Sequence, residues 1–422
     1  MVKIKAGIIS YMIFLLCFCT LQLAKSGERY LITDYGAVND GQTLNTNAIQ
    51  SVIDLCEKNG GGTVIVPGGI FLSGALFLKQ GVNLHVEKNG ILKGTVNPDD
   101  YPQVFTRWEG VECDWTSALV NAFDMTGLKI TGEGTIDGSG EKWMERYPRY
   151  NNDLKVGRPR LIAVQNCSDV LVSGISLKNQ ACWGLFILYS TDVVVENLCI
   201  TAEHHIISSD GIDIDSGKRI RISGCDIDVN DDCISIKSGK DEDGRRVNRP
   251  TEEILIEKCR FRYGHGGVAM GSEMSGGIRN VMIRDCVMEA DNWAPIRFKS
   301  QPSRGGVVEN ITFRDIVLNN TRKAFEFNME WRMVPPVMPP SDPLPVVRNI
   351  TIMNVNGTVN TVGDMHGLKD SPIQNVSFKD CNIFAQKGFI IENVEGLDVT
   401  GLHLTVEEGD AIIYKNTQQK DK

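Results

Sequence analysis

A ten-residue pattern that recurs nine times constrains the fold of this chain more than any other feature. The repeats begin at intervals of 21 to 39 residues, and each has apolar residues at its third, fifth and eighth places. Alternation with a period of two predicts β-strands with one buried face. The repeats are SDVLVSGISL (168–177), TDVVVENLCI (191–200), KRIRISGCDI (218–227), EEILIEKCRF (252–261), RNVMIRDCVM (279–288), ENITFRDIVL (309–318), RNITIMNVNG (348–357), QNVSFKDCNI (374–383) and EGLDVTGLHL (395–404).

The spacing of these strands predicts how they are arranged. No single repeat can bury its own apolar face, so the units must stack on one another. Strands joined in this way run parallel, and parallel crossovers are right-handed. A coil of just over 20 residues is too short for a strand–helix–strand unit of about 30 residues. We therefore predict an all-β fold, a right-handed parallel β-helix in which the extra residues of longer repeats form loops.

Two places of the repeat predict columns of like residues. The eighth place is aliphatic in some repeats and cysteine in four, namely Cys225, Cys259, Cys286 and Cys381. We interpret these cysteines as small buried hydrophobes, although a disulfide between coils about 4.8 Å apart stays open. The second place holds asparagine in four repeats, namely Asn280, Asn310, Asn349 and Asn375. These asparagines predict a ladder of side-chain hydrogen bonds along the stack.

The first 26 residues have the pattern of a secretory signal peptide. Lys3 and Lys5 precede an apolar run from about residue 8 to 21, and Ala24-Lys25-Ser26 offers small residues before a cleavage point at Gly27. The run is short for a membrane span of about 20 residues. We predict export to the periplasm or the cell exterior, with no membrane span after cleavage.

The remaining chain, 27–422, is predicted to be one β-helix domain, with residues 27–100 as its amino-terminal cap and first coils. The open end of a solenoid needs a cap. The apolar positions of 46–58 lie on one face of a helix that Asn45 or Thr46 begins and residues 59–62 end.

The composition restricts the partners. The net charge of −9 becomes −12 once the three lysines of the first 26 residues are removed. This acidic balance disfavours nucleic acids and anionic membranes as general partners. It does not exclude an acidic polysaccharide substrate, because a cleft on an acidic protein can be locally basic. We expect a monomer without a cofactor or a metal ion.

A second set of strands in the same coils places chemistry on one outer face. Their second and fourth places are apolar and predicted to point inward, whereas the third place and the residue two beyond it are predicted to point to solvent. These outward residues are Phe186, Asp213, Asp215, Ser235, Lys237, Ala269, Gly271, Arg297, Lys299, Glu326 and Asn328. The turns before these strands carry Asp210, Asp231, Asp232 and His265. Stacking should gather these acids, the histidine, Arg297 and Lys299 into one groove.

Such a group suits the hydrolysis of an acidic glycoside. Clustered carboxylates have separated pKa values, so one can protonate a leaving oxygen while another activates water. Arg297 and Lys299 supply cations for a uronate carboxylate, which arginine can bind with two hydrogen bonds.

Four short motifs resemble glycoside hydrolase family 28, the polygalacturonases and their relatives. The family has Asn-Thr-Asp, Gly-Asp-Asp, Gly-His-Gly and Arg-Ile-Lys in this order. The corresponding segments here are Ser208-Ser209-Asp210, Asn230-Asp231-Asp232, Gly264-His265-Gly266 and Arg297-Phe298-Lys299. The resemblance extends to residues 35–41 and 271–277, and so covers nearly the whole chain after residue 26.

The resemblance implies an inverting hydrolase of α-linked galacturonic acid in pectin. Asp231 would be the general acid, and Asp210 and Asp232 would hold and activate the water. His265 would tune the acid or contact the sugar. Arg297 and Lys299 would bind the carboxylate at the subsite whose glycosidic bond is cleaved.

Several alternatives stay open at this point. Replacement of Asn-Thr by Ser208-Ser209 leaves rhamnogalacturonan or another branched pectin as a second substrate. A pectate lyase would need a calcium site, for which Asp213 and Asp215 are candidates, and a non-catalytic pectin-binding β-helix would need no acidic group at all. Cleavage at the chain end or within the chain depends on the loops 99–117, 139–160 and 331–345. Three aromatic residues are candidate sugar-stacking platforms or ordinary loop packing, namely Tyr263, Trp293 and Trp331.

Overall fold

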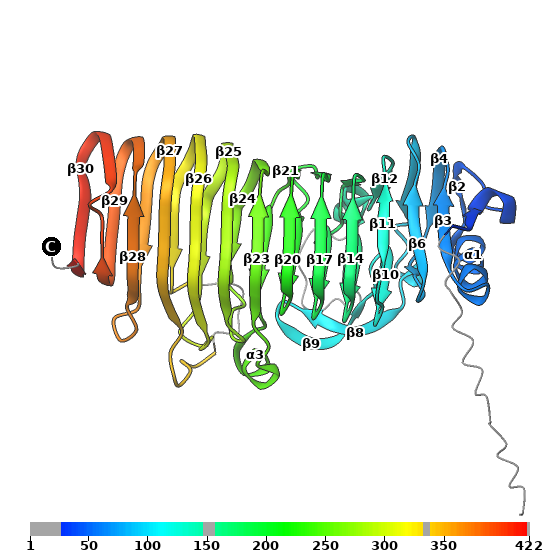
Figure 1. The fold of residues 1–422 in the computed structure, drawn as a ribbon, viewed down its shortest axis with the longest axis horizontal. Helices are drawn as coiled ribbons and strands as arrows, with labels where there is room; N and C mark the ends of the chain where they lie inside the picture. Colours follow the sequence, from blue (N-terminus) through cyan, green and yellow to red (C-terminus); the bar gives the residue numbers. More distant parts are fainter. Residues whose placement is uncertain (1–26, 147–156, 332–337, 420–422) are drawn as a thin grey trace, which may run out of the picture.

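The chain folds into an elongated solenoid whose strands stack along one axis (Figure 1). This computed structural model describes residues 27–146, 157–331 and 338–419, apart from the side chains of 290–292. The predicted signal peptide, 1–26, lies outside the described residues. Among the helices of the described part, none has the length and apolarity needed to cross a membrane.

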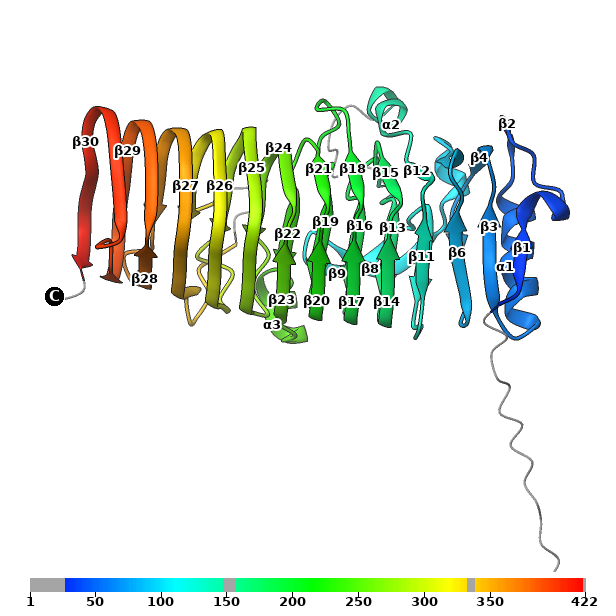
Figure 2. The same ribbon diagram turned by 45° about the horizontal axis from the view of Figure 1, so that its top comes forward.

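Three rows of parallel strands build the solenoid, and Figure 2 shows how the strands follow one another along it. The first row contains β1 (Arg29–Leu31), β3 (Gly62–Val66), β6 (Val82–Val86), β11 (Lys129–Gly132), β14 (Ser168–Ser173), β17 (Thr191–Glu196), β20 (Lys218–Ser223) and β23 (Thr251–Glu257). The second row contains β2 (Asp40–Leu44), β4 (Gly69–Ser73), β7 (Gly90–Gly94), β12 (Thr135–Asp137), β15 (Ser176–Lys178), β18 (Cys199–Thr201) and β21 (Asp226–Asp228). The third row contains β5 (Leu76–Phe77), β10 (Val120–Phe123), β13 (Ile162–Gln165), β16 (Leu185–Leu188), β19 (Ile212–Asp215) and β22 (Ile234–Lys237).

Further along the chain, single strands turn the corners and join several rows. They are β24 (Arg260–Met270), β25 (Ile278–Lys299), β26 (Val307–Asn328), β27 (Val346–His366), β29 (Cys381–Leu397) and β30 (Leu402–Gln419). The short strand β28 (Ile373–Lys379) pairs with β27 and continues the first row. The predicted right-handed parallel β-helix is confirmed.

The register confirms the repeat as the unit of the fold. The third place of one repeat pairs with the third place of the next, as in Val170 with Val193 and Val193 with Ile220. These side chains are buried, together with the residues of the fifth and eighth places, and form one continuous core. The apolar pattern therefore fixes which face of each strand points inward.

Both predicted columns are present. The four cysteines of the eighth place are buried free thiols. In the asparagine column, the side-chain amide of each residue donates to the carbonyl oxygen of the preceding one, at 3.1, 3.2 and 3.2 Å. All four asparagines have φ between 54° and 57°, the left-handed region that asparagine tolerates better than most residues.

The amino-terminal cap is the helix α1 (Thr46–Lys58), with the predicted bounds. Its buried residues Ile49, Val52, Ile53 and Cys56 cover the first coils. Asn45 occupies the N-cap position, but its side chain bonds the backbone of Val38 and Leu72 instead of the helix. The other helical segments are the short η1 (Ile32–Tyr35), η2 (Pro98–Asp100), α2 (Gly140–Arg146) and α3 (Asp241–Val247).

An antiparallel hairpin lies across the third row and corrects one prediction. Its strands β8 (Gln103–Trp108) and β9 (Val111–Thr116) extend along several coils (Figure 1). The Arg107 guanidinium reaches Asp215 of β19 at 2.6 Å, and the backbone N–H of Lys240 donates to Gly110 at the hairpin tip. The outward side chains of β16, β19 and β22, which we expected to face solvent, are therefore buried beneath this cover.

Candidate active site

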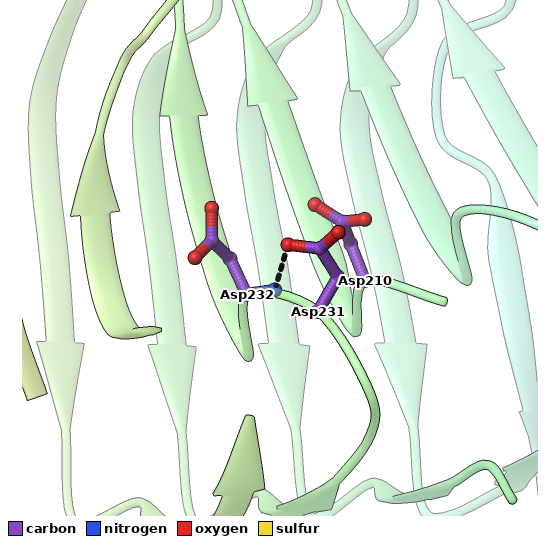
Figure 3. Close-up of side chains that lie close together, drawn as sticks. All are labelled: Asp210, Asp231 and Asp232. Atoms are coloured by element: carbon purple, nitrogen blue, oxygen red, sulfur yellow. Dashed lines mark hydrogen bonds between the residues drawn. The ribbon is translucent and has the colours of Figure 1, made fainter. Parts of the chain in front are cut away.

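The structure brings together all six residues that the sequence singled out. Asp210 precedes β19 and Asp231-Asp232 precede β22, and the parallel register aligns these turns. The side chains of the three aspartates each offer an oxygen, and these oxygens lie within 4.8 Å of one another. Figure 3 shows the carboxylates of Asp210 and Asp231 side by side, with Asp232 next to Asp231.

The two glycines around His265 make room for the acids. The backbone N–H of His265 donates to the carbonyl oxygen of Asp231 at 3.0 Å. A Cβ atom on Gly264 would lie 2.6 Å from that same oxygen, and a Cβ atom on Gly266 would lie 2.6 Å from Oδ1 of Asp232. A side chain at either position would displace an acidic residue, so the Gly-His-Gly sequence has a steric cause.

Asp232 is held by both predicted cations. Lys299 donates from Nζ to its Oδ2 at 2.6 Å, and Arg297 donates to its Oδ1 at 3.3 Å. Arg297 also donates from Nε to Glu326 at 2.6 Å. Burial raises the pKa of Glu326, but the charges of Arg297 and Lys323 outweigh burial and hold that pKa below its usual value. The group therefore keeps two buried carboxylates beside two cations.

Asp210 has the opposite electrostatic setting. Burial and the neighbouring charges of Asp213 and Asp231 raise its pKa well above the usual value. Burial also raises the pKa of Asp213 to about 6, even though Lys237 lies 2.8 Å from its Oδ1. Asp210 therefore retains a proton more readily than an ordinary carboxyl group does.

Asp231 is paired with His265. Its Oδ1 lies 3.3 Å from Nδ1 of the imidazole. Burial raises the pKa of Asp231, but the hydrogen bond and charge of His265 outweigh burial and hold it below its usual value. The same hydrogen bond raises the pKa of His265. Both shifts favour a proton on the imidazole of His265 over one on the carboxylate of Asp231.

Comparison with known proteins identifies the family. The family model described as glycosyl hydrolases family 28 matches residues 56–403. The chain belongs to this family. The resemblance found in its four motifs is therefore confirmed.

Three family relatives illustrate the similarity. The crystal structure of a hyperthermoactive exopolygalacturonase from Thermotoga maritima is 31% identical, with a TM-score of 0.77, over 88% of this chain and 92% of that one. A probable polygalacturonase of Vitis vinifera is 32% identical over 305 residues, 70% of this chain and 61% of that protein. An exo-poly-alpha-D-galacturonosidase of Dickeya chrysanthemi is 29% identical over 337 residues, 69% of this chain and 55% of that protein. The match thus spans little more than half the length of the last two relatives.

The family 28 acids line a small cavity that also contains residues the sequence did not single out as site residues. The cavity has a volume of about 60 Å³ and includes Glu109, Trp183, Lys237, Ser272 and Glu273 beside the predicted groups. Lys237 stood in the outward-facing pattern, and Glu273 lies in the segment 271–277 used for the resemblance. Nothing in the sequence indicated Glu109, which lies at the tip of the hairpin. Trp183 stands in the column of Asp210 and Asp232, so the alignment of the strands could have indicated it.

The departures from the family 28 motifs have different consequences. Ser208 lines the cavity, whereas Ser209 is buried and accepts a hydrogen bond from the backbone N–H of Asn230 at 3.2 Å. Phe298 points into the core, as predicted, and stacks on Phe327 with 4.3 Å between ring centroids. The change at Ser208 therefore alters the lining of the cavity, whereas the changes at Ser209 and Phe298 are buried.

The three aromatic residues that we considered as sugar-stacking platforms differ in their surroundings. Tyr263 stacks on His204 at 3.6 Å, so one face of its ring is covered. The ring of Trp331 lies 4.6 Å from the Arg297 guanidinium and 5.6 Å from Lys299, beside the acids. Trp293 is exposed.

The acidic groups differ in their capacity for a metal ion. Asp213 and Asp215, the candidates for a lyase-type calcium site, are paired with Lys237 and Arg107. These two carboxylates are already compensated by cations. The trio Asp210, Asp231 and Asp232 has the spacing to hold a divalent cation.

Proposed function

We propose that this chain is a glycosidase that hydrolyses α-linked galacturonic acid in pectin-type polysaccharides. The observation that carries this proposal is the contact of Asp232 with Lys299 and Arg297 beside two further carboxylates. Glycoside hydrolysis needs a carboxylic acid and a carboxylate on either side of the bond. A neutral sugar would not need two cations at that place, whereas a uronate binds to them by charge.

The proposed roles follow the positions of the family 28 motifs. Asp231 is the general acid, and His265 holds the proton of the pair until a bound sugar desolvates Asp231 and raises its pKa. Asp232, which accepts a hydrogen bond from Lys299, and Asp210 hold and activate the water. Arg297 and Lys299 bind the carboxylate of the sugar whose bond is cleaved. The raised pKa of Asp210 supports an alternative assignment of the roles, in which Asp210 is the general acid.

The inverting course of the reaction rests on family membership. Carboxyl groups of inverting enzymes are typically about 6.5–9.5 Å apart. The nearest oxygens of the trio are within 4.8 Å, so spacing alone does not favour inversion. Nuclear magnetic resonance of the first-formed product decides the point, because inversion of an α-linkage gives the β-anomer.

The hairpin β8–β9 supports cleavage at the chain end. It buries the outer faces of β16 and β19, and Trp108 of the hairpin stacks on Trp183 with 4.8 Å between ring centroids. In the later coils, the outer-face residues Asn328 and Asp364 stay partly exposed. Ala269, Arg297, Lys299 and Glu326, which we also expected to face solvent, are buried. A groove covered on one side of the acids and open on the other admits one end of a polymer. We therefore propose exo-action with a short product.

The test combines product analysis with two variants. The parent protein is incubated with polygalacturonate and with rhamnogalacturonan; monomer from polygalacturonate supports the proposal, and a ladder of oligomers contradicts exo-action. Asp231→Asn is expected to lose about a thousandfold or more in kcat on polygalacturonate. It should retain much of the parent's activity on a nitrophenyl galacturonide, whose leaving group needs no proton. Asp210→Asn should lose activity on both substrates.

The reverse pattern of the two variants would assign the acid role to Asp210. Rapid cleavage of rhamnogalacturonan, without cleavage of polygalacturonate, would show that the substrate is rhamnogalacturonan. Binding of pectin without cleavage of either polymer would leave a non-catalytic β-helix, and an unsaturated product suppressed by a chelator would indicate a lyase.

A further inference from the structure

The column that contains Asp231 and His265 continues along the solenoid. In the next coil, Gly266 pairs with Ala294, and this places Trp293 beside His265. One coil further, Ile296 pairs with Phe325, and the same offset places Arg322 beside Trp293. Stacked coils are about 4.8 Å apart. A polymer that lies along the groove from the acids therefore passes Trp293 first and Arg322 second.

The side chain of Trp293 is exposed but held in place. It is 40% exposed, although large aromatic residues are usually buried. Its indole N–H donates to Oε1 of Glu326 at 3.4 Å. The other oxygen of Glu326 accepts from Arg297. One buried carboxylate thus orients both the exposed ring and the cation of the site.

The charge beside this ring is not compensated. The guanidinium of Arg322 lies 5.3 Å from the centroid of Trp293, and Arg322 is exposed. Among the described side chains, which leave out those of 290–292, no ion pair of Arg322 is present. Lys323 is also near the ring, at 5.8 Å, but its ammonium group is bound by Glu326 and Asp364. Arg322 is therefore the cation available to a ligand at this ring.

We propose that Trp293 and Arg322 form a distal subsite for a further uronate unit of the polysaccharide. The apolar C–H face of a pyranose packs on the exposed indole, and its carboxylate pairs with the guanidinium. This inference rests on the proposed function and extends it. The enzyme then prefers longer galacturonate chains, because a dimer that occupies the acids, Arg297 and Lys299 does not reach Arg322.

The test measures kcat/KM on digalacturonate and on hexagalacturonate. Trp293→Ala is expected to lose about tenfold on the hexamer, the size of one aromatic contact and its burial, and less than about twofold on the dimer. Arg322→Gln should show the same pattern, with a loss that shrinks as salt is added. An equal loss on dimer and hexamer, or no loss on either, would overturn the subsite.

Two control variants separate stacking from indirect effects. Trp293→Phe keeps an aromatic face but lacks the N–H that bonds Glu326, so it should retain most of the preference for the hexamer. If it behaves like Trp293→Ala, the residue acts by positioning Glu326 and Arg297, and the subsite is refuted. Phe384→Ala removes another exposed aromatic residue, which is 56% exposed and lies in a distant coil. This variant should leave kcat/KM unchanged on both the dimer and the hexamer.

A binding measurement distinguishes this inference from the proposed function. Calorimetry in an Asp231→Asn background compares the affinity for hexagalacturonate with and without Trp293→Ala. A weaker affinity with Trp293→Ala supports the subsite even if the parent protein cleaves no galacturonate. An unchanged affinity, or no binding of the hexamer at all, refutes the subsite.

Discussion

The charge of Asp213 contributes to the raised pKa of Asp210. Replacement of Asp213 should therefore change the pH dependence of activity. Burial raises the pKa of Asp210 first, and the negative charge of Asp213 raises it further. Asp213→Asn removes that charge and leaves Lys237 beside the site, so the pKa of Asp210 should fall. Asp210 acts as a base only when ionised. The acid limb of kcat/KM against pH is therefore expected to move to lower pH.

The control for this prediction is Asp226→Asn. Asp226 pairs with exposed Arg262 at 2.6 Å and lies outside the cavity, so its replacement should leave the profile unchanged. A shift of the alkaline limb in Asp213→Asn, with the acid limb fixed, would contradict the base role. It would instead show that Asp210 must be protonated.

For single residues, the sequence predicted where the site side chains lie better than it predicted which groups surround them. Asp210, Asp231 and His265 were predictable because each stands at a fixed offset from a strand of strict periodicity. The burial of Asp213 and Asp215 was not, because it depends on Arg107 and Lys237, which approach from other coils and from the hairpin. Outward orientation follows from the repeat, whereas exposure depends on what covers the face.

Among the elements, the hairpin β8–β9 covers one side of the groove, and the ion pair between Arg107 and Asp215 anchors it to β19. Arg107 is 0% exposed, and its partner Asp215 is 1% exposed. Arg107→Ala would leave a buried carboxylate without its cation, at a cost of about 3–5 kcal/mol. We expect a lower midpoint in urea unfolding. If the hairpin lifts, oligomers longer than the parent's product should also appear from polygalacturonate.

A second ion pair of the same hairpin provides the matched control. Arg246, with a side chain 59% exposed, reaches Glu112 of β9 at 2.5 Å. Because solvent screens this pair, Arg246→Ala should leave the midpoint of urea unfolding nearly unchanged and keep the product pattern. Equal effects of the two variants would show that the buried pair does not anchor the hairpin. The sequence indicated a loop at 99–117 but not its place, since no repeat registers it against the coils.

Across the whole molecule, a single continuous core replaces the disulfides that an exported chain with many cysteines invites. The ten cysteines from Cys56 to Cys381 are all free, and most of them are buried. Burial raises the pKa of Cys56 and of Cys182 to about 11, which keeps these thiols protonated and unreactive. For the four cysteines of the eighth-place column, a thiol fills the space that isoleucine or leucine fills in other coils.

The free thiols and the proposed signal peptide together predict a thiol count and an intact mass. If residues 1–26 direct export and are cleaved, the exported protein should have the mass of residues 27–422, and alkylation after denaturation should add ten groups. In the native state, exposed Cys199 should react first, and the buried thiols should not. A reductant should leave the thermal midpoint unchanged, since a disulfide would contribute about 2–4 kcal/mol that reduction removes. Fewer than ten alkylations, with a midpoint lowered by reductant, would show that neighbouring coils are cross-linked; an uncleaved mass would refute the signal peptide.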